Sequence, residues 1–336
     1  MLENMRTVGV VMAFILAACV TAETAVSQPS TAKVDGHISD RGWDLVWADE
    51  FDGDALDRTK WSPEVSCWGG GNEERQCYID RLENVSVAGG YLWLTARDGE
   101  WTGPGVHMEH PAYPGASKTK PYTSGKVRTR DLAAWKYGRI EGRMELPNGQ
   151  GAWPAFWMMP QSSVHGGWPL SGEIDIMEAV NLGATCYDCA DSDVENRSSG
   201  AIHFGKRPPN NTHVSERRAL TSVAGQDGMP REQFHTFAVE WGEGRIDWFV
   251  DGDRFWTAKA EDWFTDAVRK SENPNAPFDE DFYLMLNFAV GGKWPEGDNE
   301  RGIDPSVIPS ALIVDYVRVY QCDADLETGR ACMFDD

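Results

Sequence analysis

Hydrophobic and polar residues alternate most sharply over residues 172–179, in the stretch Gly-Glu-Ile-Asp-Ile-Met-Glu-Ala. Side chains of a β-strand alternate between its two faces, so Glu173 and Asp175 are expected on one face with isoleucines packed into a core behind them. Strict alternation would send Glu178 to the apolar face. One extra residue absorbed as a β-bulge near Ile176-Met177 returns Glu178 to the face of the other two carboxylates. The pattern therefore predicts a bulged strand with three converging carboxylates.

The rest of the chain consists of short apolar runs separated by Gly, Asn, Asp and Pro, which is typical of an all-β protein. Ile246–Gly252 followed by Phe255–Thr257 predicts a hairpin with an Asp-Gly turn, and Val314–Tyr320 predicts a further strand. Helical periodicity is nearly absent, and its one candidate is a short turn of helix within Ala258–Lys270. No break in composition divides the 336 residues, so we expect one large β-sandwich domain.

The carboxylate cluster indicates a particular chemistry. Carboxylates held together at low exposure cannot all be ionised at neutral pH, because repulsion and desolvation raise the pKa of at least one. A protonated acid beside an ionised carboxylate is the pair that cleaves a glycosidic bond. Two carboxyls about 5–5.5 Å apart leave no room for a water between them, which predicts a covalent intermediate and retention of anomeric configuration.

The rival interpretation is that these acids form the solvated face of an amphipathic strand, since the chain holds 53 Asp and Glu residues. Trp153, Trp157 and Trp168 lie just upstream of the cluster. Sugar rings stack on aromatic faces beside polar groups, so these neighbours favour the catalytic interpretation.

The net charge of the chain indicates which class of polymer it binds. With 31 Lys and Arg against 53 Asp and Glu, the chain carries −22, which makes nucleic acids and sulfated polymers poor partners. A neutral polysaccharide fits better.

The chain begins with the pattern of an export signal. The apolar stretch Val8–Ala18 is only 11 residues long, which is too short to span a bilayer and typical of a signal peptide. It runs into Leu-Ala-Ala-Cys, similar to a bacterial lipobox that would leave Cys19 lipidated; ordinary cleavage near Ala22 or Ala25 is the alternative. We expect a periplasmic or extracellular protein, or one anchored to the outer membrane through Cys19. The expected segments are a signal peptide over 1–19, a linker over 20–40, a catalytic domain over 41–322 and a tail over 323–336.

Six cysteines remain besides Cys19, an even number for an oxidising compartment. Their spacing favours local pairs, and the simplest connectivity joins Cys67 to Cys77, Cys186 to Cys189, and Cys322 to Cys332. A half zinc site or a redox motif is the alternative for Cys186 and Cys189, although no second cysteine pair has zinc-ribbon spacing.

A series of motifs lies in order between about Trp43 and Tyr320. They are LVWADEFDGDALDRTKW (45–61), CWGGGNEERQCYIDRLENVSV (67–87), YTSGKVRT (122–129), YGRIEGRMELPNGQGAWPAFWMMP (137–160), GEIDIMEAVN (172–181), AIHFG (201–205), FHTFAVEWGEGRIDWFVDG (234–252), FYLMLNFAVGGKWP (282–295) and DYVRVYQ (315–321). Together they resemble glycoside hydrolase family 16, and within it the bacterial endo-1,3-β-glucanases called laminarinases. The resemblance implies a β-jelly roll of two antiparallel sheets, one of which forms a concave substrate cleft.

The resemblance also assigns roles. Glu173 corresponds to the nucleophile, Glu178 to the general acid and then base, and Asp175 to the residue between them that tunes protonation through a hydrogen bond to the nucleophile. Because Glu178 must give and then take a proton, its pKa is expected above that of Glu173.

Further family positions imply substrate contacts. They are Asn72, Arg128, Trp153, Trp157, Trp168, His203, Asn287 and Trp294. Trp168 is the preferred stacking platform, whereas core packing is an alternative for Trp157 and structural hydrogen bonding for His203. Arg128 and Asn287 could be ordinary polar groups with satisfied hydrogen bonds. Trp43, Trp47 and Trp61 are interpreted as packing.

Many family members carry a stabilising calcium ion away from the cleft. The matching positions here are Glu50 and Gly90, through backbone oxygens, and Asp315, through its carboxylate. An ordinary aspartate on a strand is the alternative. No cofactor is expected for catalysis.

The expected function is retaining hydrolysis of internal β-1,3-glucosidic bonds by a monomer with no transmembrane span. Alternatives are mixed-linkage glucan or agar-type galactan as substrate, transfer to another sugar, and a β-glucan-binding protein without hydrolysis. The last is disfavoured because all three carboxylates are present. The insertion Leu182–Gly200 is expected to form a loop over one end of the cleft.

Overall fold

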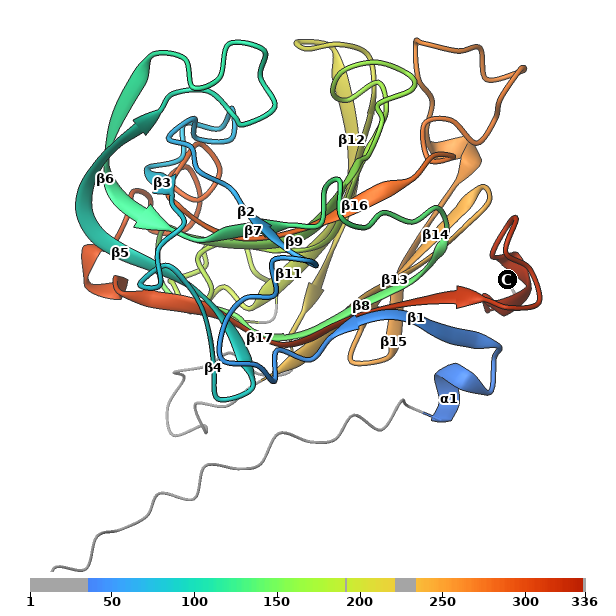
Figure 1. Ribbon diagram of the computed structural model, residues 1–336, viewed down its shortest axis with the longest axis horizontal. Helices are drawn as coiled ribbons and strands as arrows, with labels where there is room; N and C mark the ends of the chain where they lie inside the picture. The colour runs from blue at the N-terminus through green and yellow to red at the C-terminus, as the bar shows by residue number, and fades with distance from the viewer. Residues whose placement is uncertain (1–35, 191, 221–233, 335–336) are drawn as a thin grey trace, which may run out of the picture.

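The computed structural model describes residues 36–190, 192–220 and 234–334, which form two stacked β-sheets (Figure 1). Within these residues, helical structure is confined to α1 (Gly36–Ser39) and three 3-10 turns, η1 (Ala260–Asp262), η2 (Pro305–Val307) and η3 (Arg330–Cys332). All strand pairs described are antiparallel except the pair of β3 (Gln76–Tyr78) and β6 (Ser117–Ser124). The all-β class expected from the sequence is confirmed.

The outer sheet has ten strands. Its order is β15 (Asp253–Lys259), β14 (Arg245–Val250), β13 (His235–Gly242), β8 (Gly138–Glu145), β17 (Ser310–Cys322), β5 (Tyr91–Pro104), β6 and β3, with β1 (Trp43–Asp49) pairing with β17 and β4 (Val85–Ala88) with β5. The predicted hairpin and the predicted strand over Val314–Tyr320 both belong to this sheet.

The inner sheet has seven strands. Its order is β12 (Asn211–Ala219), β11 (Arg197–Gly205), β10 (Glu173–Ala179), β9 (Ala152–Pro160), β16 (Phe282–Val290), β7 (Lys126–Arg128) and β2 (Ser62–Pro63). Both sheets curve in the same direction, and the inner sheet presents a concave face away from the outer one (Figure 1). We call this surface the concave face.

The core lies between the two sheets, where alternate side chains from each sheet meet. Phe156, Ile174 and Leu286 come from the inner sheet, and Ile140 and Trp241 from the outer one; all are fully buried in one cluster. Trp43 and Trp61 are buried and Trp47 is partly buried, as the packing interpretation expected. Burial of alternate positions is the pattern that period-two sequences predict.

All three expected disulfides are present: Cys67–Cys77, Cys186–Cys189 and Cys322–Cys332. The second of these bonds engages both sulfurs and so excludes the zinc alternative for Cys186 and Cys189. The redox alternative stays untested, because the oxidised form of a redox pair is also a disulfide.

Both ends of the described chain dock on the domain. Ile38 and Met333 are buried in a small cluster with Trp43 and the Cys322–Cys332 disulfide. Ile38 at the end of the expected linker, and Cys332 and Met333 near the end of the expected tail, are therefore packed parts of the fold. The expected signal peptide, Cys19 and the rest of the linker up to residue 35 lie outside the described residues.

The helix predicted within Ala258–Lys270 is wrong except for the 3-10 turn η1. Strand β15 continues to Lys259, and the apolar residues that follow do not share a helical face. Trp263 packs edge-on against Phe278, and Phe264 against Phe204, so tertiary contacts decide this segment. No helix of the described chain is long and apolar enough to cross a membrane.

The predicted bulge in β10 is present. Asp175 and Glu178 oppose Ala201 and Ser199 of β11, so three steps along β10 match two along its neighbour. The register against β9 shifts between Asp175 and Met177. The extra residue leaves both flanking carboxylates on the concave face, while Ile176 and Met177 are buried in the core.

Trp248 of β14 supports the bulge from beneath. Its indole N–H donates to the backbone carbonyl of Asp175 over 2.8 Å, and the ring is fully buried. A bulge interrupts the ladder of hydrogen bonds, and a buried carbonyl needs another donor. Gly200 makes room for the ring, since a Cβ there would lie 2.3 Å from Trp248 Cδ1. The outer sheet thus fixes the shape of the catalytic strand.

The expected calcium positions lie where β17 passes from pairing with β5 to pairing with β1. The carboxylate of Asp315 is held by Arg143 at 2.5 Å, and that of Glu50 by Arg318 at 2.8 Å. The one carboxylate expected to bind calcium is thus paired with an arginine in this arrangement. The calcium site stays a prediction, with Arg143 as the group that a cation would have to displace.

Trp248→Phe is expected to lower the free energy of unfolding by about 1–3 kcal/mol, because the buried carbonyl of Asp175 loses its donor. It is also expected to lower kcat, since the bulge loses its support. Chemical denaturation and steady-state kinetics measure both effects. Trp256→Phe is the matched control: Trp256 lies against Trp248 with centroids 4.1 Å apart and planes 30° apart. Within the described residues, no hydrogen bond joins Trp256 to the bulge. Equal losses in the two variants would contradict this role.

Candidate active site

Glu173 and Glu178 are each held by a tryptophan indole on the concave face. Trp168 Nε1 donates to Glu173 Oε2 over 2.8 Å, and Trp153 Nε1 donates to Glu178 Oε1 over 3.0 Å. Trp153 is buried, whereas 39% of Trp168 is exposed. Both tryptophans therefore orient the predicted catalytic carboxylates, and Trp168 keeps a ring surface for a ligand.

His203 lies between the first two carboxylates. Its Nε2 is 3.4 Å from Asp175 Oδ2 and 3.7 Å from Glu173 Oε1. We expected a hydrogen bond from Asp175 to the nucleophile, but the described contacts place the imidazole beside both groups. Asp175 is buried, and its Oδ2 has no hydrogen bond within the described residues. His203 is thus a charge partner of the carboxylates rather than a purely structural group.

Burial and repulsion shift the pKa values of this cluster. Burial, followed by the charge of Asp175, raises the pKa of Glu173 to about 7 and that of Glu178 to about 8. Burial disfavours the imidazolium of His203, but Glu173 and Asp175 raise its pKa to about 10. At neutral pH His203 is a cation and Glu178 holds a proton. The order of the two glutamate pKa values agrees with the expectation from the sequence.

Strand register brings most of the expected substrate residues to the same face. Asp175 of β10 pairs with Trp157 of β9, which pairs with Met285 of β16, which pairs with Arg128 of β7. Directly paired residues share a face of a sheet, and so do residues two apart on one strand. The concave face therefore carries five of the expected residues: Arg128, Trp153, Trp157, His203 and Asn287.

Trp157 and Asn287 form one unit on this face. The indole N–H of Trp157 donates to Asn287 Oδ1 over 2.7 Å, and the ammonium of Lys126 lies 4.9 Å from the ring centroid. Trp157 is partly buried, so it is not purely a core residue.

Arg128 is largely buried and pairs with Glu109, from the loop between β5 and β6. Glu109 also pairs with Arg130. Arg128 therefore ties this loop to the inner sheet, and a role in ligand contact is secondary to that anchoring.

Trp294 and Asn72 come from loops. Trp294 lies edge-on to Trp153, with centroids 5.4 Å apart, and its N–H donates to Asp298 over 2.9 Å. Asn72 is exposed, and its carbonyl accepts from the backbone N–H of Lys293, next to Trp294. The structure thus places both residues beside the Glu178 end of β10.

Sequence reasoning missed Glu109, Lys126, His213 and Arg217, which contact residues of this face, and Trp248, which supports the bulge from the outer sheet beneath it. His213 stacks on His203 with centroids 5.2 Å apart, and the Arg217 guanidinium lies 5.8 Å from the Trp294 ring centroid. These residues come together only because segments far apart in the sequence meet in the fold. A local pattern could have revealed only His213 and Arg217, through the alternation of side chains along β12.

Two clusters of described residues have a metal-like donor set, and neither suits an ion. Cys186 and Cys189 stand beside Asp188 and Glu195, but both sulfurs are in a disulfide. In the cluster of Glu173, Asp175 and His203, the raised pKa of His203 keeps its nitrogen protonated at neutral pH. A metal would have to displace that proton.

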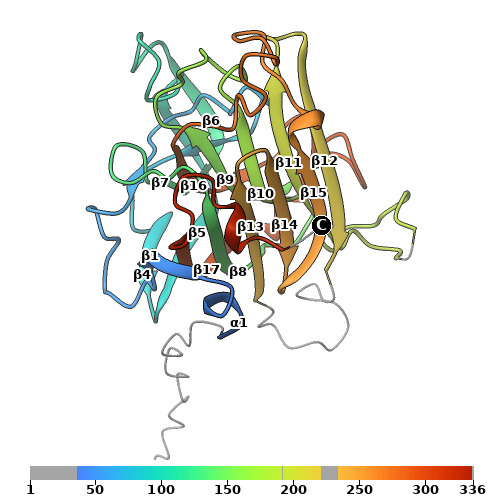
Figure 2. The ribbon, with the colours of Figure 1, turned by 90° about the vertical axis from the view of Figure 1, so that its right-hand side faces the viewer.

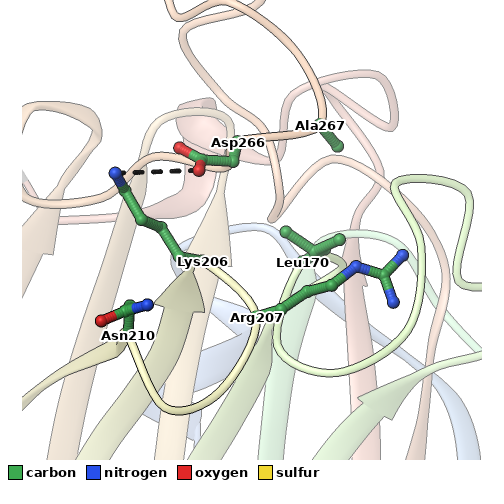
Figure 3. Close-up of a pocket in the computed structure, with 6 residues that line it drawn as sticks. All are labelled: Leu170, Lys206, Arg207, Asn210, Asp266 and Ala267. Carbon is green, nitrogen blue, oxygen red and sulfur yellow. Dashed lines mark ion pairs between the residues drawn. The ribbon is translucent and has the colours of Figure 1, made fainter.

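Two hollows flank the carboxylates. The first, of 370 Å³, adjoins Leu170, two residues beyond Trp168, and Lys206 reaches Asp266 across it at 3.8 Å (Figure 3). The second, of 580 Å³, is lined by the loop between β10 and β11 and the segment after Trp294. One hollow lies toward the Glu173 end and the other toward the Glu178 end.

Comparisons with known proteins agree with this geometry. The family profile described as "Beta-porphyranase A-D, GH16 domain" matches residues 43–322. The chain is 38% identical over 293 residues to glucan endo-1,3-beta-glucosidase A1 of Niallia circulans, covering 83% of this chain and 38% of that protein. It is 38% identical over 285 residues to the beta-glucanase of Rhodothermus marinus, covering 83% and 85%.

The fold is also similar to solved structures. The laminarinase of Rhodothermus marinus superposes with a TM-score of 0.65 at 35% identity, covering 83% of this chain and 97% of that chain.

One relative found by sequence is named as a binding protein. It is the beta-1,3-glucan-binding protein of Penaeus monodon, which is 30% identical and covers 75% of this chain and 76% of that protein. The two-sheet jelly roll, the bulged strand with its three carboxylates and these matches together place the chain in glycoside hydrolase family 16.

Proposed function

We propose that this chain is a secreted, retaining endo-β-1,3-glucanase that cleaves laminarin-type glucans. The observation that carries the proposal is the bulge, which puts Glu178 on the face of Glu173 with Asp175 and His203 beside them. The name of the Niallia circulans relative, a glucan endo-1,3-beta-glucosidase at 38% identity, supports the β-1,3 linkage.

Glu173 and Glu178 account for the bonds and the proton transfers in both steps of the proposed hydrolysis. Glu173 Oε attacks the anomeric carbon as the proton of Glu178 passes to the departing glycosidic oxygen. Glu178, now ionised, accepts a proton from the incoming water, whose oxygen displaces Glu173 with a second inversion. The His203 imidazolium stabilises the carboxylate charge of Glu173 before attack. The Trp168 N–H holds Oε2 of Glu173, which leaves Oε1 for the sugar.

A second candidate substrate is porphyran, because the matching family profile is that of β-porphyranases. Mixed-linkage glucan and agar-type galactan remain alternative substrates, which would be cleaved by the same mechanism. A non-hydrolytic glucan-binding role has a precedent in the Penaeus relative. The intact cluster of Glu173, Asp175 and Glu178 favours hydrolysis over binding alone.

The substrate is tested by product analysis of the purified protein on laminarin, lichenan, agarose, porphyran and xyloglucan. Laminarin is expected to be cleaved fastest, since two relatives at 38% identity are named as a glucan endo-1,3-beta-glucosidase and a beta-glucanase. Cleavage of porphyran or agarose without laminarin would reject the glucan assignment and keep the family.

Glu173→Gln and Glu178→Gln are each expected to lower kcat on laminarin by about 100-fold or more, because each removes a group that forms or breaks a bond. Both substitutions keep the side-chain shape, so thermal unfolding is expected to change little. Proton NMR of the wild-type reaction is expected to show the β-anomer first. Early α-anomer would exclude retention.

His203→Gln is expected to move the pH profile of kcat/KM to higher pH. Activity requires ionised Glu173 and protonated Glu178, so the wild-type profile is expected to rise near pH 7 and fall near pH 8. The positive charge of His203 lowers both pKa values, and its removal raises both.

His213→Gln is the control for this shift. Burial and the charge of His203 lower the pKa of His213, so it is neutral in this range. Its substitution is expected to leave both limbs nearly in place. A profile that His203→Gln does not move would reject the electrostatic role.

A further inference from the structure

The hollow of 580 Å³ near the Glu178 end lies outside the residues that the proposed mechanism uses. One wall is the loop between β10 and β11, which projects from the edge of the sheets (Figure 2). The other wall is the segment Gly297–Arg301. We call it the distal hollow.

The two walls are joined by hydrogen bonds, so the distal hollow is preformed. Glu300 accepts from the backbone N–H and the hydroxyl of Thr185, at 2.9 and 2.6 Å. Asn299 donates to Glu195 over 3.3 Å and accepts from Asn181 over 2.9 Å. A site whose walls are fixed before binding loses little entropy when a ligand enters.

Backbone strain gathers at the same place. Asn181, Asn299 and Arg301 have φ values of 57°, 54° and 65°. Asparagine tolerates this left-handed region, but a residue such as arginine rarely adopts it. Strain of this kind persists only where the surroundings hold it, and it is concentrated at binding and catalytic sites.

The groups left for a ligand are an aromatic ring and planar polar side chains. Tyr187 stands between Cys186 and Cys189 and is 78% exposed, and Arg301 is exposed with no ion pair within the described residues. An aromatic ring beside a guanidinium and carboxylates can stack on a sugar and bond its hydroxyls. The first hollow has no aromatic ring among its lining residues.

Charge selects a neutral ligand for the distal hollow. Its lining has four carboxylates, those of Asp188, Glu195, Asp298 and Glu300, against two guanidiniums, those of Arg197 and Arg301. Arg197 already pairs with Glu195 at 2.7 Å. The excess of two negative charges repels sulfate or phosphate esters.

A chain of contacts links the distal hollow to the general acid. Asp298 lines the hollow and accepts from Trp294, which packs on Trp153, which donates to Glu178. We propose that the distal hollow is a remote subsite for a neutral glucan chain, with Tyr187 as its stacking platform. This inference rests on the proposed function.

The test is kcat/KM on β-1,3-glucan oligosaccharides of increasing length. Tyr187→Ala is expected to raise KM about 2- to 10-fold for long chains, which is the worth of one aromatic contact, and to leave the shortest cleaved chain unchanged. With a reducing-end label, the variant is expected to change the position at which long chains are cut. Arg301→Gly is expected to act similarly, since glycine accepts the φ of this position.

Two controls separate this subsite from a general effect on the fold. Tyr187→Phe keeps the ring and is expected to retain wild-type KM. Leu82→Ala removes a side chain of equal exposure from another turn and is expected to change nothing. Equal changes on short and long chains, or none on any, would overturn the subsite. Wild-type protein that cleaves no β-1,3 oligosaccharide would overturn the proposed function, and the subsite with it.

Discussion

The site depends on one extra residue in β10. A regular strand that buried Ile174 and Ile176 would also bury Glu178, which would bring a carboxylate into the core. The bulge allows the apolar residues to be buried without burying Glu178. Ile176 and Met177 both face the core, while the carboxylates on either side share the concave face. The carbonyl of Asp175 is then bonded from the opposite sheet by Trp248. The hydrophobic core and the chemistry are therefore set by the same local irregularity.

Electrostatics follows from that geometry. Three carboxylates on one short strand, one of them buried and two partly buried beside tryptophans, cannot all carry charge. His203, opposite Glu173 on β11, supplies a positive charge beside the carboxylates, and Glu178, farther along the strand, keeps its proton. The two glutamates thus differ through their surroundings, which is what a mechanism with an acid and a nucleophile requires.

Local patterns made much of this structure predictable. The alternation over residues 172–179 was enough to place the bulge, and the Asp251-Gly252 turn to place the hairpin. Close cysteine spacing was enough for the disulfides. Each of these features depends on residues near one another in the chain.

Features that depend on distant strands were not predictable. Glu109 meets Arg128 only because a loop folds back over the inner sheet, and Trp248 meets the bulge only because the sheets stack. The same cause explains the failed helix near Trp263, where packing against Phe278 overrode a weak periodic pattern. The Arg143 pairing of Asp315 likewise depends on the register of β8 and β17.

The most direct measurement is covalent trapping with a 2-deoxy-2-fluoro β-1,3-glucosyl glycoside that has a reactive leaving group, followed by peptide mapping. The account predicts one added glycosyl group per chain, attached to Glu173, and no adduct in Glu173→Gln. An adduct on Asp175 or Glu178, or turnover of the reagent without any adduct, would contradict a nucleophile positioned by the bulge.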